Sequence, residues 1–257
     1  ADAASEAVSS GVVENGDLMI MLGTSAFFIQ IVNKFVRSIK VWPTVYLKPG
    51  MYAIAAAMSS CGAIISWLRE LLESYTFDQI DEMVEKSPIG NEGILALPYF
   101  SGERTPINDP TARGSILGLS LYHKKEHITR AIFESIAYGI RDNLENIEKA
   151  CMPIRRNIVI GGVTKNRNLM QIISNVTKKE LFIPKINYGA CFGNAFLAGL
   201  GVGVFQSMGD ILNWVRWEKS IKPQAEKSSE YDKYYKLYKK FYKATSDIVH
   251  ELVDLSK

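Results

Sequence analysis

The sequence contains few cysteines, few histidines and no long apolar run. Its three cysteines lie far apart and form no CxxC pair, which argues against a disulfide framework and against a structural zinc site. The three histidines also lack the spacing of metal ligands. No apolar stretch approaches the ~20 residues that a membrane-spanning helix needs, and no charged segment precedes an apolar signal segment. We therefore expect reduced thiols and a cytoplasmic protein.

The sequence also lacks a strong excess of charge of either sign. Its net charge is +3, so the chain as a whole has no pronounced attraction to nucleic acids or anionic membranes. Of its 257 residues 47% are hydrophobic, which is enough to bury the core of one large domain with an appendage. The chain begins with alanine, and we expect that it has been cut from a longer protein.

Hydrophobic periodicity predicts strands first and then helices that alternate with strands. Residues 18–22 and 26–32 form an antiparallel hairpin in this interpretation, and a further strand lies around 52–57. The other expected elements are a short helix over 2–10, a helix behind Gly62, a long loop over 98–114, a strand over 115–119, a long helix over 128–140, a strand over 157–160, a helix over 169–176, a strand ending at Pro184, a helix over about 193–203 and a mostly helical segment from Ser207 onward. This order indicates an α/β fold with a mixed sheet.

Three glycine turns lie at strand ends or helix starts: Gly23-Thr24-Ser25, Gly62, and Gly161-Gly162 with Asn166. Glycine lets the backbone approach a polyphosphate closely, and a helix N-terminus presents unpaired N–H groups. A Thr hydroxyl could donate to a phosphate, and an Asn amide could bond to an adenine or ribose edge. Each turn alone is a weak signal, because a plain hairpin turn or a helix C-cap explains it more simply than a bound ligand does.

Longer motifs give these turns a common context. Residues 114–119 (GSILGL) are followed, after seven residues, by 127–134 (HITRAIFE), and the pair fits the signature of the FGGY carbohydrate kinases at every constrained position. Residues 98–110 (PYFSGERTPINDP) resemble the loop typical of xylulokinases, with Ile107 where a histidine is common. Residues 161–173 resemble the adenosine motif of the family, and 189–203 its small-residue closing helix. Over about residues 1–205 the chain thus resembles the C-terminal domain of these kinases, most closely that of xylulokinases.

The resemblance implies a ribonuclease-H-like, actin-like α/β domain over 1–205 with a mixed sheet flanked by helices. It also implies that a C-terminal helical extension over 206–257 packs on this domain. The N-terminal sugar-binding domain of the family is absent from this chain, so we expect that the isolated half does not turn over. Dimers are common in the family, so the resemblance is compatible with a homodimer.

The same resemblance assigns functional residues. Asp2 matches the aspartate that takes the proton from the attacking sugar hydroxyl; without the resemblance it would be interpreted as a helix cap. The nucleotide contacts that it implies are Gly23 and Thr24 at a phosphate turn, Gly62 beside the phosphates, Ser66 one helical turn further, and Gly161, Gly162 and Asn166 in the adenosine motif. ATP with Mg²⁺ would donate its γ-phosphate to a hydroxyl of a small sugar, with D-xylulose favoured. No residue is assigned as a protein ligand of a metal.

Alternatives remain open at this point. Gluconate, ribulose and polyol kinases share the architecture, and a non-catalytic, actin-like nucleotide-binding module would carry the same turns. Arg104 and Arg113 are left without a role, Glu134 is expected to be buried against one of them, and His127 is expected at a helix start.

The C-terminal segment mixes tyrosines with lysines, which is typical of surfaces that bind single-stranded nucleic acids. Its apolar residues nevertheless recur on one helical stripe, formed by Tyr231, Tyr235, Tyr238, Tyr242, Val249 and Leu252. This pattern favours a helix docked on a core over a surface that binds nucleic acids.

Overall fold

The computed structural model describes residues 2–47, 49–73, 75–185 and 189–256. A seven-stranded sheet with the order β3-β4-β2-β1-β7-β8-β9 forms its centre, and β5 and β6 pair separately. The strands are β1 (Asp17–Leu22), β2 (Ala26–Val32), β3 (Trp42–Val45), β4 (Tyr52–Met58), β5 (Leu95–Leu97), β6 (Ser115–Leu117), β7 (Arg156–Ile160), β8 (Leu181–Pro184) and β9 (Trp217–Ile221). The mixed α/β fold predicted from the sequence is confirmed.

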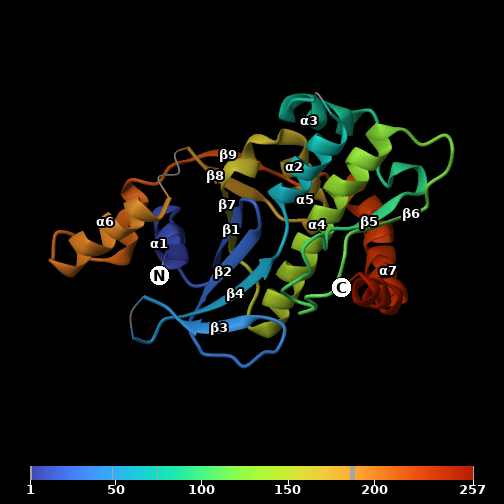
Figure 1. Cartoon of the computed structure of the whole chain (residues 1–257). Helices are drawn as coiled ribbons and strands as arrows, with labels where there is room; N and C mark the ends of the chain where they lie inside the picture. The colour runs from blue at the N-terminus through green and yellow to red at the C-terminus, as the bar shows by residue number, and fades with distance from the viewer. Residues whose placement is uncertain (1, 48, 74, 186–188, 257) are drawn as a thin grey trace.

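Helices cover both faces of the sheet (Figure 1). On one face lie α1 (Asp2–Ser9) and α6 (Gly189–Gly201), where the Ser5 hydroxyl donates to Asn194 Oδ1 at 2.5 Å. The other face carries the longer helices. They are α2 (Gly62–Leu71), α3 (Phe77–Glu85), α4 (Lys125–Ala150), α5 (Arg167–Thr177) and α7 (Ala225–Leu255), and short 3₁₀ turns span Asn91–Gly93, Gly162–Lys165 and Met208–Asn213.

The strand directions bring three turns to one edge of the sheet. Strand β1 pairs antiparallel with β2, and β2 pairs antiparallel with β4, so β1 and β4 run in the same direction. Strand β7 is parallel to β1. The chain therefore leaves Leu22, Met58 and Ile160 at the same edge, and the three glycine turns predicted from the sequence follow these residues.

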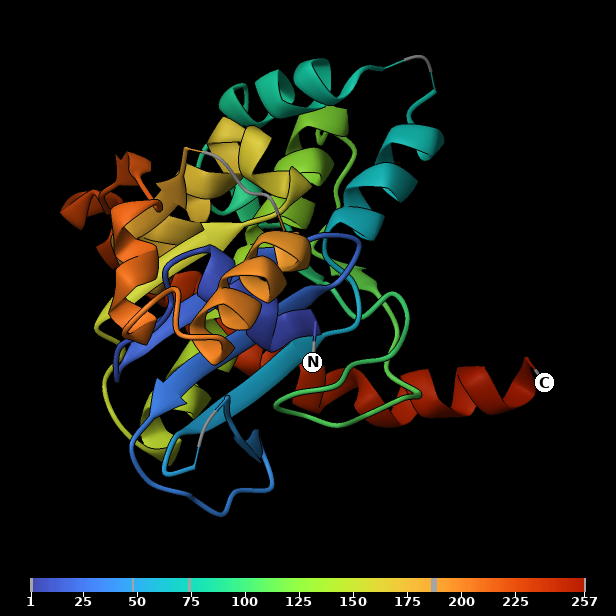
Figure 2. The same cartoon turned by 90° about the vertical axis from the view of Figure 1, so that its left-hand side faces the viewer.

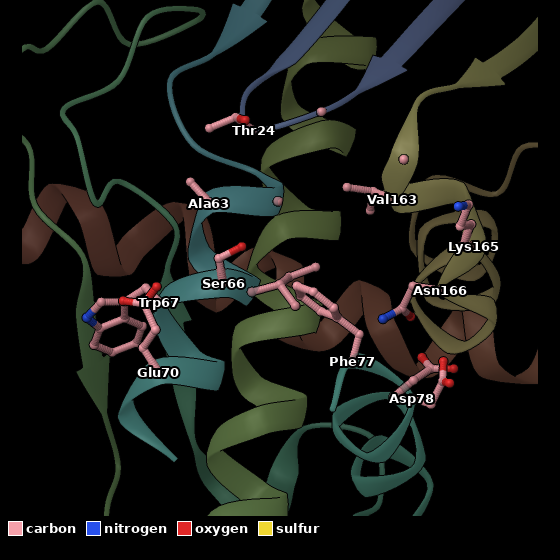
Figure 3. A pocket seen from close by; sticks show the side chains of 15 residues that line it. Thr24, Ala63, Ser66, Trp67, Glu70, Phe77, Asp78, Val163, Lys165 and Asn166 are labelled. Atoms are coloured by element: carbon pink, nitrogen blue, oxygen red, sulfur yellow. The ribbon is translucent and has the colours of Figure 1, made fainter. Parts of the chain in front are cut away.

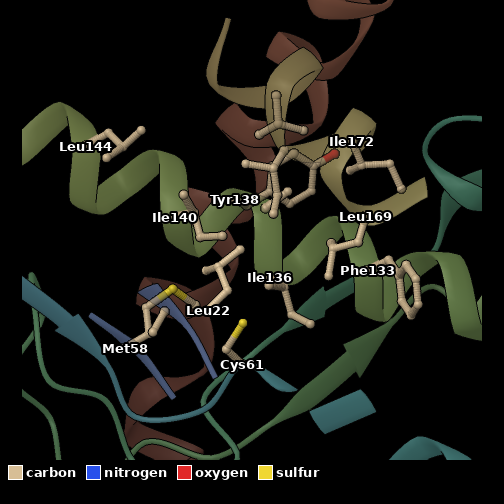
Figure 4. Packing of buried hydrophobic residues seen from close by; sticks show 14 of the residues in the cluster. Leu22, Met58, Cys61, Phe133, Ile136, Tyr138, Ile140, Leu144, Leu169 and Ile172 are labelled. Carbon is tan, nitrogen blue, oxygen red and sulfur yellow. The ribbon is translucent and has the colours of Figure 1, made fainter. Parts of the chain in front are cut away.

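The main core lies between the sheet and the central helix α4. Leu22 and Met58 from the sheet pack toward Ile136 and Ile140 of α4, and Leu169 of α5 closes the same layer (Figure 4). All five side chains are buried, because the apolar face of α4 recurs at helical spacing and meets the alternating inward side chains of the strands.

Several elements differ from the sequence-based expectation. Strands β3, β5 and β9 and helix α3 were not predicted, the strand expected over 115–119 ends at Leu117, and the helix expected over about 193–203 spans Gly189–Gly201. The missed strands are short. Strands β3 and β9 are the edges of the seven-stranded sheet, β5 belongs to the separate pair, and β3 contains Pro43, which makes such segments hard to recognise by alternation. The segment 206–257 was expected to be helical, but it also contributes strand β9 to the sheet.

Helix α7 docks through its tyrosines, as its spacing predicts. Tyr231, Tyr235 and Tyr238 are buried, and the Tyr238 hydroxyl lies 2.8 Å from that of Tyr99. The stripe was wrong at its end, however, because Leu252 is exposed and Val253 is buried in its place.

Glu134 is buried, but not against Arg104 or Arg113 as expected. Its carboxylate accepts from Arg130 Nε at 2.8 Å, one helical turn away, and from Asn91 Nδ2 at 3.0 Å. Arg130 also donates to the carbonyl oxygen of Ser87 and to the hydroxyl of Tyr231. Charged groups that lose water need several compensating hydrogen bonds. The bonds that this buried ion pair makes link α4 to the α3 region and to α7. Burial is the main reason that the pKa of Glu134 is raised above its ordinary value.

His127 occupies the helix start that the sequence assigns to it, since its Nδ1 accepts from the Lys124 N–H at 2.9 Å.

Within the described part of the chain, no helix combines the length and apolar character needed to cross a bilayer.

Candidate functional site

A pocket of about 750 Å³ opens at the sheet edge where β1, β4 and β7 end (Figure 3). Six of the seven residues predicted to contact a nucleotide line it: Gly23, Thr24, Gly62, Ser66, Gly162 and Asn166. The seventh, Gly161, lies one residue before the lining. Residues separated by more than 140 positions in sequence thus share one cavity, because their strands run in the same direction in one sheet.

The turn after β1 and the start of α2 bond directly to each other. The Gly62 N–H donates to the carbonyl oxygen of Gly23 at 2.9 Å. The N–H groups of Cys61 and Ala63 both donate to the carbonyl oxygen of Thr24, at 2.8 and 3.1 Å. A Cβ at Gly62 would lie 2.6 Å from the Gly23 oxygen. The expectation that this helix start presents unpaired donors was therefore wrong, since the β1–β2 turn accepts them. The structural requirement for glycine at 62 is close approach of two backbones.

The turn after β7 combines a strained glycine with an open one. Gly161 has φ +101°, and a Cβ there would overlap with the carbonyl oxygen of Leu22. Gly162 has no atom within 4 Å of the position that its Cβ would occupy. Gly161 therefore allows the backbone conformation and the close approach that the turn requires, and Gly162 leaves space at the pocket wall.

Asn166 has two separable functions in the structure. Its Oδ1 accepts from the Leu169 N–H at 2.9 Å and caps the N-terminus of α5. In Figure 3 the nitrogen end of the same side chain points into the pocket. Because the cap fixes the amide plane, Nδ2 is held as a donor toward the cavity.

Thr24 and Ser66 place hydroxyl groups on the opposite side of the pocket (Figure 3). Thr24 is exposed at the tip of the β1–β2 turn, and Ser66 is half-buried on the second turn of α2. Together with Asn166 they give the cavity neutral hydrogen-bonding groups on both walls.

Helix α3 supplies a part of the lining that the sequence interpretation missed. Phe77, Asp78 and Asp81 face the cavity from its first two turns, and the Arg69 guanidinium lies 4.5 Å from the centre of the Phe77 ring. Thr76 and Gln79 form a capping box at the start of this helix. The T-x-x-Q spacing was a readable signal for α3, because such a box satisfies two orphan N–H groups reciprocally.

Asp81 joins α3 to α5 at the pocket wall. Its Oδ1 accepts from the Asn168 N–H at 3.2 Å, and its carbonyl oxygen accepts from Asn168 Nδ2 at 3.0 Å. Partial burial raises the pKa of Asp81 to about 6. The carboxyl group therefore changes charge close to neutral pH at the edge of the cavity.

The loop over 98–114 supports the pocket through hydrogen bonds to the end of β4. Thr105 Oγ1 accepts from the Ala57 N–H at 2.8 Å, and Glu103 Oε1 accepts from the N–H groups of Ser59 and Arg104 at 2.7 Å each. The bonds to Ala57 and Ser59 clamp the loop to the end of β4 and to the segment that follows it. Burial raises the pKa of Glu103 to about 7. In contrast, Arg113 donates to nearby backbone carbonyl oxygens of its own loop, those of Pro110 and Ala112.

Asp2 is the first residue of α1 and is exposed. It is not part of the pocket lining. Burial, and secondarily the charge of Asp2, raise the pKa of Glu6, so the two carboxyl groups interact electrostatically on one side of this helix. The assignment of Asp2 as a base thus continues to depend on the family resemblance.

Among the described residues, no three His, Cys, Asp or Glu side chains gather to form a metal site. The three cysteines are free thiols. Burial raises the pKa of the Cys61 thiol, beside the pocket, to about 12, which makes it a poor nucleophile.

Comparison with known proteins matches residues 18–202 to the FGGY family of carbohydrate kinases, C-terminal domain. The xylulose kinase of Lactococcus lactis is 29% identical over 266 aligned positions, which cover 100% of this chain and 52% of that protein. The glycerol kinase of Borrelia hermsii is 38% identical over 186 aligned positions, which cover 72% of this chain and 38% of that protein. The solved structure of the xylulose kinase from Rhodospirillum rubrum superposes with a TM-score of 0.87 at 28% identity, covering 97% of this chain and 51% of that one.

The chain spans about half the length of the xylulose kinases that it matches. The match includes nearly all of β1, the strands β2 to β8, the three glycine turns and α4, whereas β9 and α7 lie beyond it. With the family matched over more than half of its residues, this chain belongs to the FGGY carbohydrate kinases and corresponds to their C-terminal domain.

Proposed function

We propose that this chain is the nucleotide-binding half of an ATP-dependent sugar kinase that phosphorylates a hydroxyl group of D-xylulose. The observation that carries the proposal is the convergence of three glycine turns, from β1, β4 and β7, on one pocket. A cavity of about 750 Å³ is in the range of ligand sites for drug-sized molecules. The family assignment supports phosphoryl transfer, and the xylulose kinases among its relatives support the sugar.

In this proposal ATP lies across the pocket, with its phosphates toward the β1–β2 turn and its adenosine toward α5. The Thr24 hydroxyl and the backbone of Gly162 bind and orient phosphates, Gly23 forms the turn that lets them approach, and Asn166 Nδ2 donates to the adenosine. Gly161 and Gly62 act by letting the turns approach each other. Ser66 lies between the phosphate end and the adenosine end of the pocket, and its hydroxyl group donates to an oxygen of the nucleotide.

Mg²⁺ would neutralise the phosphate charge when bound. The described residues offer no cluster of three carboxylates, which fits a cation that keeps several waters and is held mainly by the phosphates. Three carboxylates line the cavity: Asp78 and Asp81 at its α3 end, and Glu70 on α2. The two aspartates suit the adenosine side better than the phosphate side in the proposed orientation.

Asp2 is proposed as the base that orients the sugar hydroxyl and accepts its proton as the bond to phosphorus forms. Its exposed position at the start of α1 leaves its carboxylate accessible to a second domain that presents the sugar. We propose that an N-terminal domain of the same cytoplasmic enzyme supplies the sugar pocket, and that closure of the two domains excludes water. The isolated half would then bind nucleotide without turnover.

Calorimetric titration of this chain with Mg-ATP tests the nucleotide half of the proposal. Saturable binding that Gly162→Ala weakens is expected, and no binding at millimolar ATP contradicts it. A phosphorylation screen of the enzyme with both domains, against pentuloses, aldonates, glycerol and other polyols, tests the substrate. Highest kcat/KM for D-xylulose is expected, whereas preference for gluconate or glycerol would assign another member of the same family.

Asp2→Asn in the two-domain enzyme tests the base. ATP affinity should persist while sugar phosphorylation falls by about 10²-fold or more, and near-normal turnover would exclude Asp2 from that role. If no sugar stimulates ATP consumption in the two-domain enzyme, the chain is instead a non-catalytic nucleotide-binding module.

A further inference from the structure

The segment between β2 and β3 carries uncompensated positive charge. Lys34, Arg37 and Lys40 are exposed, and the sequence contains no Asp or Glu between positions 17 and 70. Within the described part of the chain, none of these three side chains forms an ion pair. Their positive charge therefore faces solvent and is available to an anionic partner.

Large apolar side chains project from the same segment. Phe35, Ile39 and Trp42 are 52, 89 and 40% exposed, and in sequence they alternate with the basic residues. Single exposed apolar residues are normal on protein surfaces, but several on one short segment mark a contact surface. We call the exposed basic and apolar residues of this segment the β3 patch: Lys34, Phe35, Arg37, Ile39, Lys40 and Trp42.

A further positive charge reaches the β3 patch from the loop over 98–114. Asn108 Nδ2 donates to the carbonyl oxygen of Ile39 at 3.1 Å, and the Asn108 N–H donates to the carbonyl oxygen of Arg104. This tight turn places the exposed Arg104 beside the patch. The two acids that flank the turn, Glu103 and Asp109, are buried, and their carboxylates accept hydrogen bonds from within the domain. The loop therefore adds to the positive charge at this surface.

The β3 patch and the nucleotide pocket lie toward opposite edges of the sheet. Strand β4 begins at Tyr52, opposite Val32, and ends at Met58, opposite Ala26. The patch follows Val32, whereas the pocket opens beyond Met58. In Figures 1 and 2, β3 and the segment that precedes it form the lower end of the molecule. An extended surface bound to the patch therefore leaves the pocket open to solvent.

The mixture of side chains favours a lipid bilayer over a nucleic acid or a protein strand. Basic side chains attract anionic head groups, and aromatic side chains prefer the boundary between head groups and acyl chains. Ile39, the most exposed of the three apolar residues, has no planar face to stack on a base but can insert among acyl chains. Pro43 lacks an N–H, which makes β3 a poor template for an added strand.

We propose that the β3 patch is a peripheral membrane contact that binds bilayers containing anionic phospholipids. The basic residues bind the head groups, and Phe35, Ile39 and Trp42 enter the interface. The net charge of the whole chain is only +3, so the attraction comes from this local cluster and the contact is reversible. This inference does not depend on nucleotide binding, because no residue of the patch lines the pocket.

Co-sedimentation with vesicles tests the charge of the patch. The chain should bind vesicles made of equal parts of phosphatidylcholine and phosphatidylglycerol, and not vesicles of phosphatidylcholine alone. Lys34→Gln with Lys40→Gln should weaken binding by about 25-fold, since each basic residue contributes about fivefold. Lys236→Gln with Lys243→Gln, at exposed positions of α7, removes the same charge elsewhere and should leave binding nearly unchanged. Equal losses in the two double variants overturn the assignment to this patch, and absence of binding to the mixed vesicles overturns the proposal.

The apolar residues are tested separately. Ile39→Ser should weaken binding by about tenfold, whereas Leu121→Ser, at a fully exposed loop position, is the matched control and should not. Tryptophan emission should shift to shorter wavelength on the mixed vesicles, and Trp42→Phe should abolish this shift while binding persists. These side chains are exposed, so thermal unfolding of each variant should match the wild type. A shift that persists in Trp42→Phe overturns insertion of the patch.

Two further measurements distinguish the membrane from other partners. The two-domain enzyme should bind the mixed vesicles as this chain does, and loss of binding there would show that the other domain covers the patch and would overturn the proposal for the enzyme. Single-stranded DNA should not compete with the vesicles. A chain that binds this DNA through Lys34 and Lys40 and ignores the vesicles has a nucleic-acid surface in place of a membrane contact.

Discussion

The Gly62 N–H donates to the Gly23 carbonyl oxygen at 2.9 Å, and this oxygen lies only 2.6 Å from where a Cβ of residue 62 would be. The β1–β2 turn and the α2 helix are therefore held together by a contact that admits no side chain. Their relative position defines one wall of the pocket. The spacing between the β1–β2 turn and the start of α2 is thus fixed by a backbone contact.

Gly62→Ala should separate the two elements. We expect destabilisation by about 1–3 kcal/mol from the forced backbone shift, together with loss of measurable Mg-ATP binding. The matched change is Gly162→Ala, where a Cβ meets open space; that variant should unfold at the wild-type temperature yet bind nucleotide more weakly. Differential scanning calorimetry and titration calorimetry on both variants provide the comparison. Equal stability of wild type and Gly62→Ala would contradict the steric role of Gly62.

Asn166 should show that its cap and its pocket-facing amide are separate functions. Asn166→Asp keeps an oxygen that can accept from the Leu169 N–H but removes the Nδ2 donor, so stability should hold while Mg-ATP affinity falls. Asn166→Ala removes both and should in addition cost about 1 kcal/mol of unfolding free energy. Urea unfolding and nucleotide titration distinguish these outcomes. If Asn166→Asp binds nucleotide as the wild type does, the amide nitrogen takes no part in binding.

Arg130→Met should be strongly destabilising, because it leaves the buried Glu134 carboxylate without its charge partner. The two side chains are 12% and 2% exposed, and loss of one partner of such a pair costs about 3–5 kcal/mol. Lys149→Met breaks an ion pair whose lysine is 74% exposed and should change stability by less than about 1 kcal/mol. Urea denaturation midpoints measure both, and similar small effects in the two variants would show that the buried pair is unimportant.

Glu103 should make stability fall as pH rises through neutrality. Its pKa in the folded chain is about 7, against an ordinary value of 4.5, so between these values the folded state binds more protons than the unfolded state. The free energy of unfolding then decreases with rising pH across this window.

Glu103→Gln removes this dependence and keeps the structure, because a single oxygen, Oε1, accepts both backbone hydrogen bonds. Above pH 7 the variant should be more stable than the wild type by up to about 3 kcal/mol, and below pH 4.5 the two should converge. Chemical denaturation at several pH values measures the difference. A difference that does not change with pH would contradict burial as the cause of the raised pKa.

Asp109 should hold the second half of α7 to the body. Its Oδ2 lies 2.7 Å from both the Tyr242 hydroxyl and His250 Nε2, and its Oδ1 accepts from the Thr111 N–H. These hydrogen bonds, with Thr111 and His250 the largest contributions, outweigh burial and hold the pKa of Asp109 below its ordinary value. Asp109→Asn replaces the acceptor at Oδ2 by a donor.

Amide hydrogen exchange measures the consequence. Exchange over residues 246–255 should accelerate about tenfold, which corresponds to the loss of about 1.4 kcal/mol from charged hydrogen bonds, while 228–240 should stay protected by the buried tyrosines. Uniform acceleration along α7 would show that the helix opens as one unit and that Asp109 has no local role.

The sequence predicted the order of strands and helices well where side chains alternate or recur over long segments. The β1–β2 hairpin, α4 and the tyrosine face of α7 are examples, because each buries a periodic face of its own. It failed at β3, β5 and β9, which have only three to five residues each, and at α3, which has nine residues. Of these, α3 mattered most, since it brings Phe77, Asp78 and Asp81 to the pocket.

The sequence by itself determined the family, the three glycine turns and the residue types at Thr24, Ser66 and Asn166, because motifs and turn chemistry are local. Only the tertiary structure decided that these turns meet at one cavity, since that requires β1, β4 and β7 to run in the same direction in one sheet. It also decided the partner of Glu134, which is Arg130 on the same helix. In the same way, it decided that the N–H groups at the start of α2 bond to the β1–β2 turn, because hydrogen-bond partners are fixed by packing between segments distant in sequence.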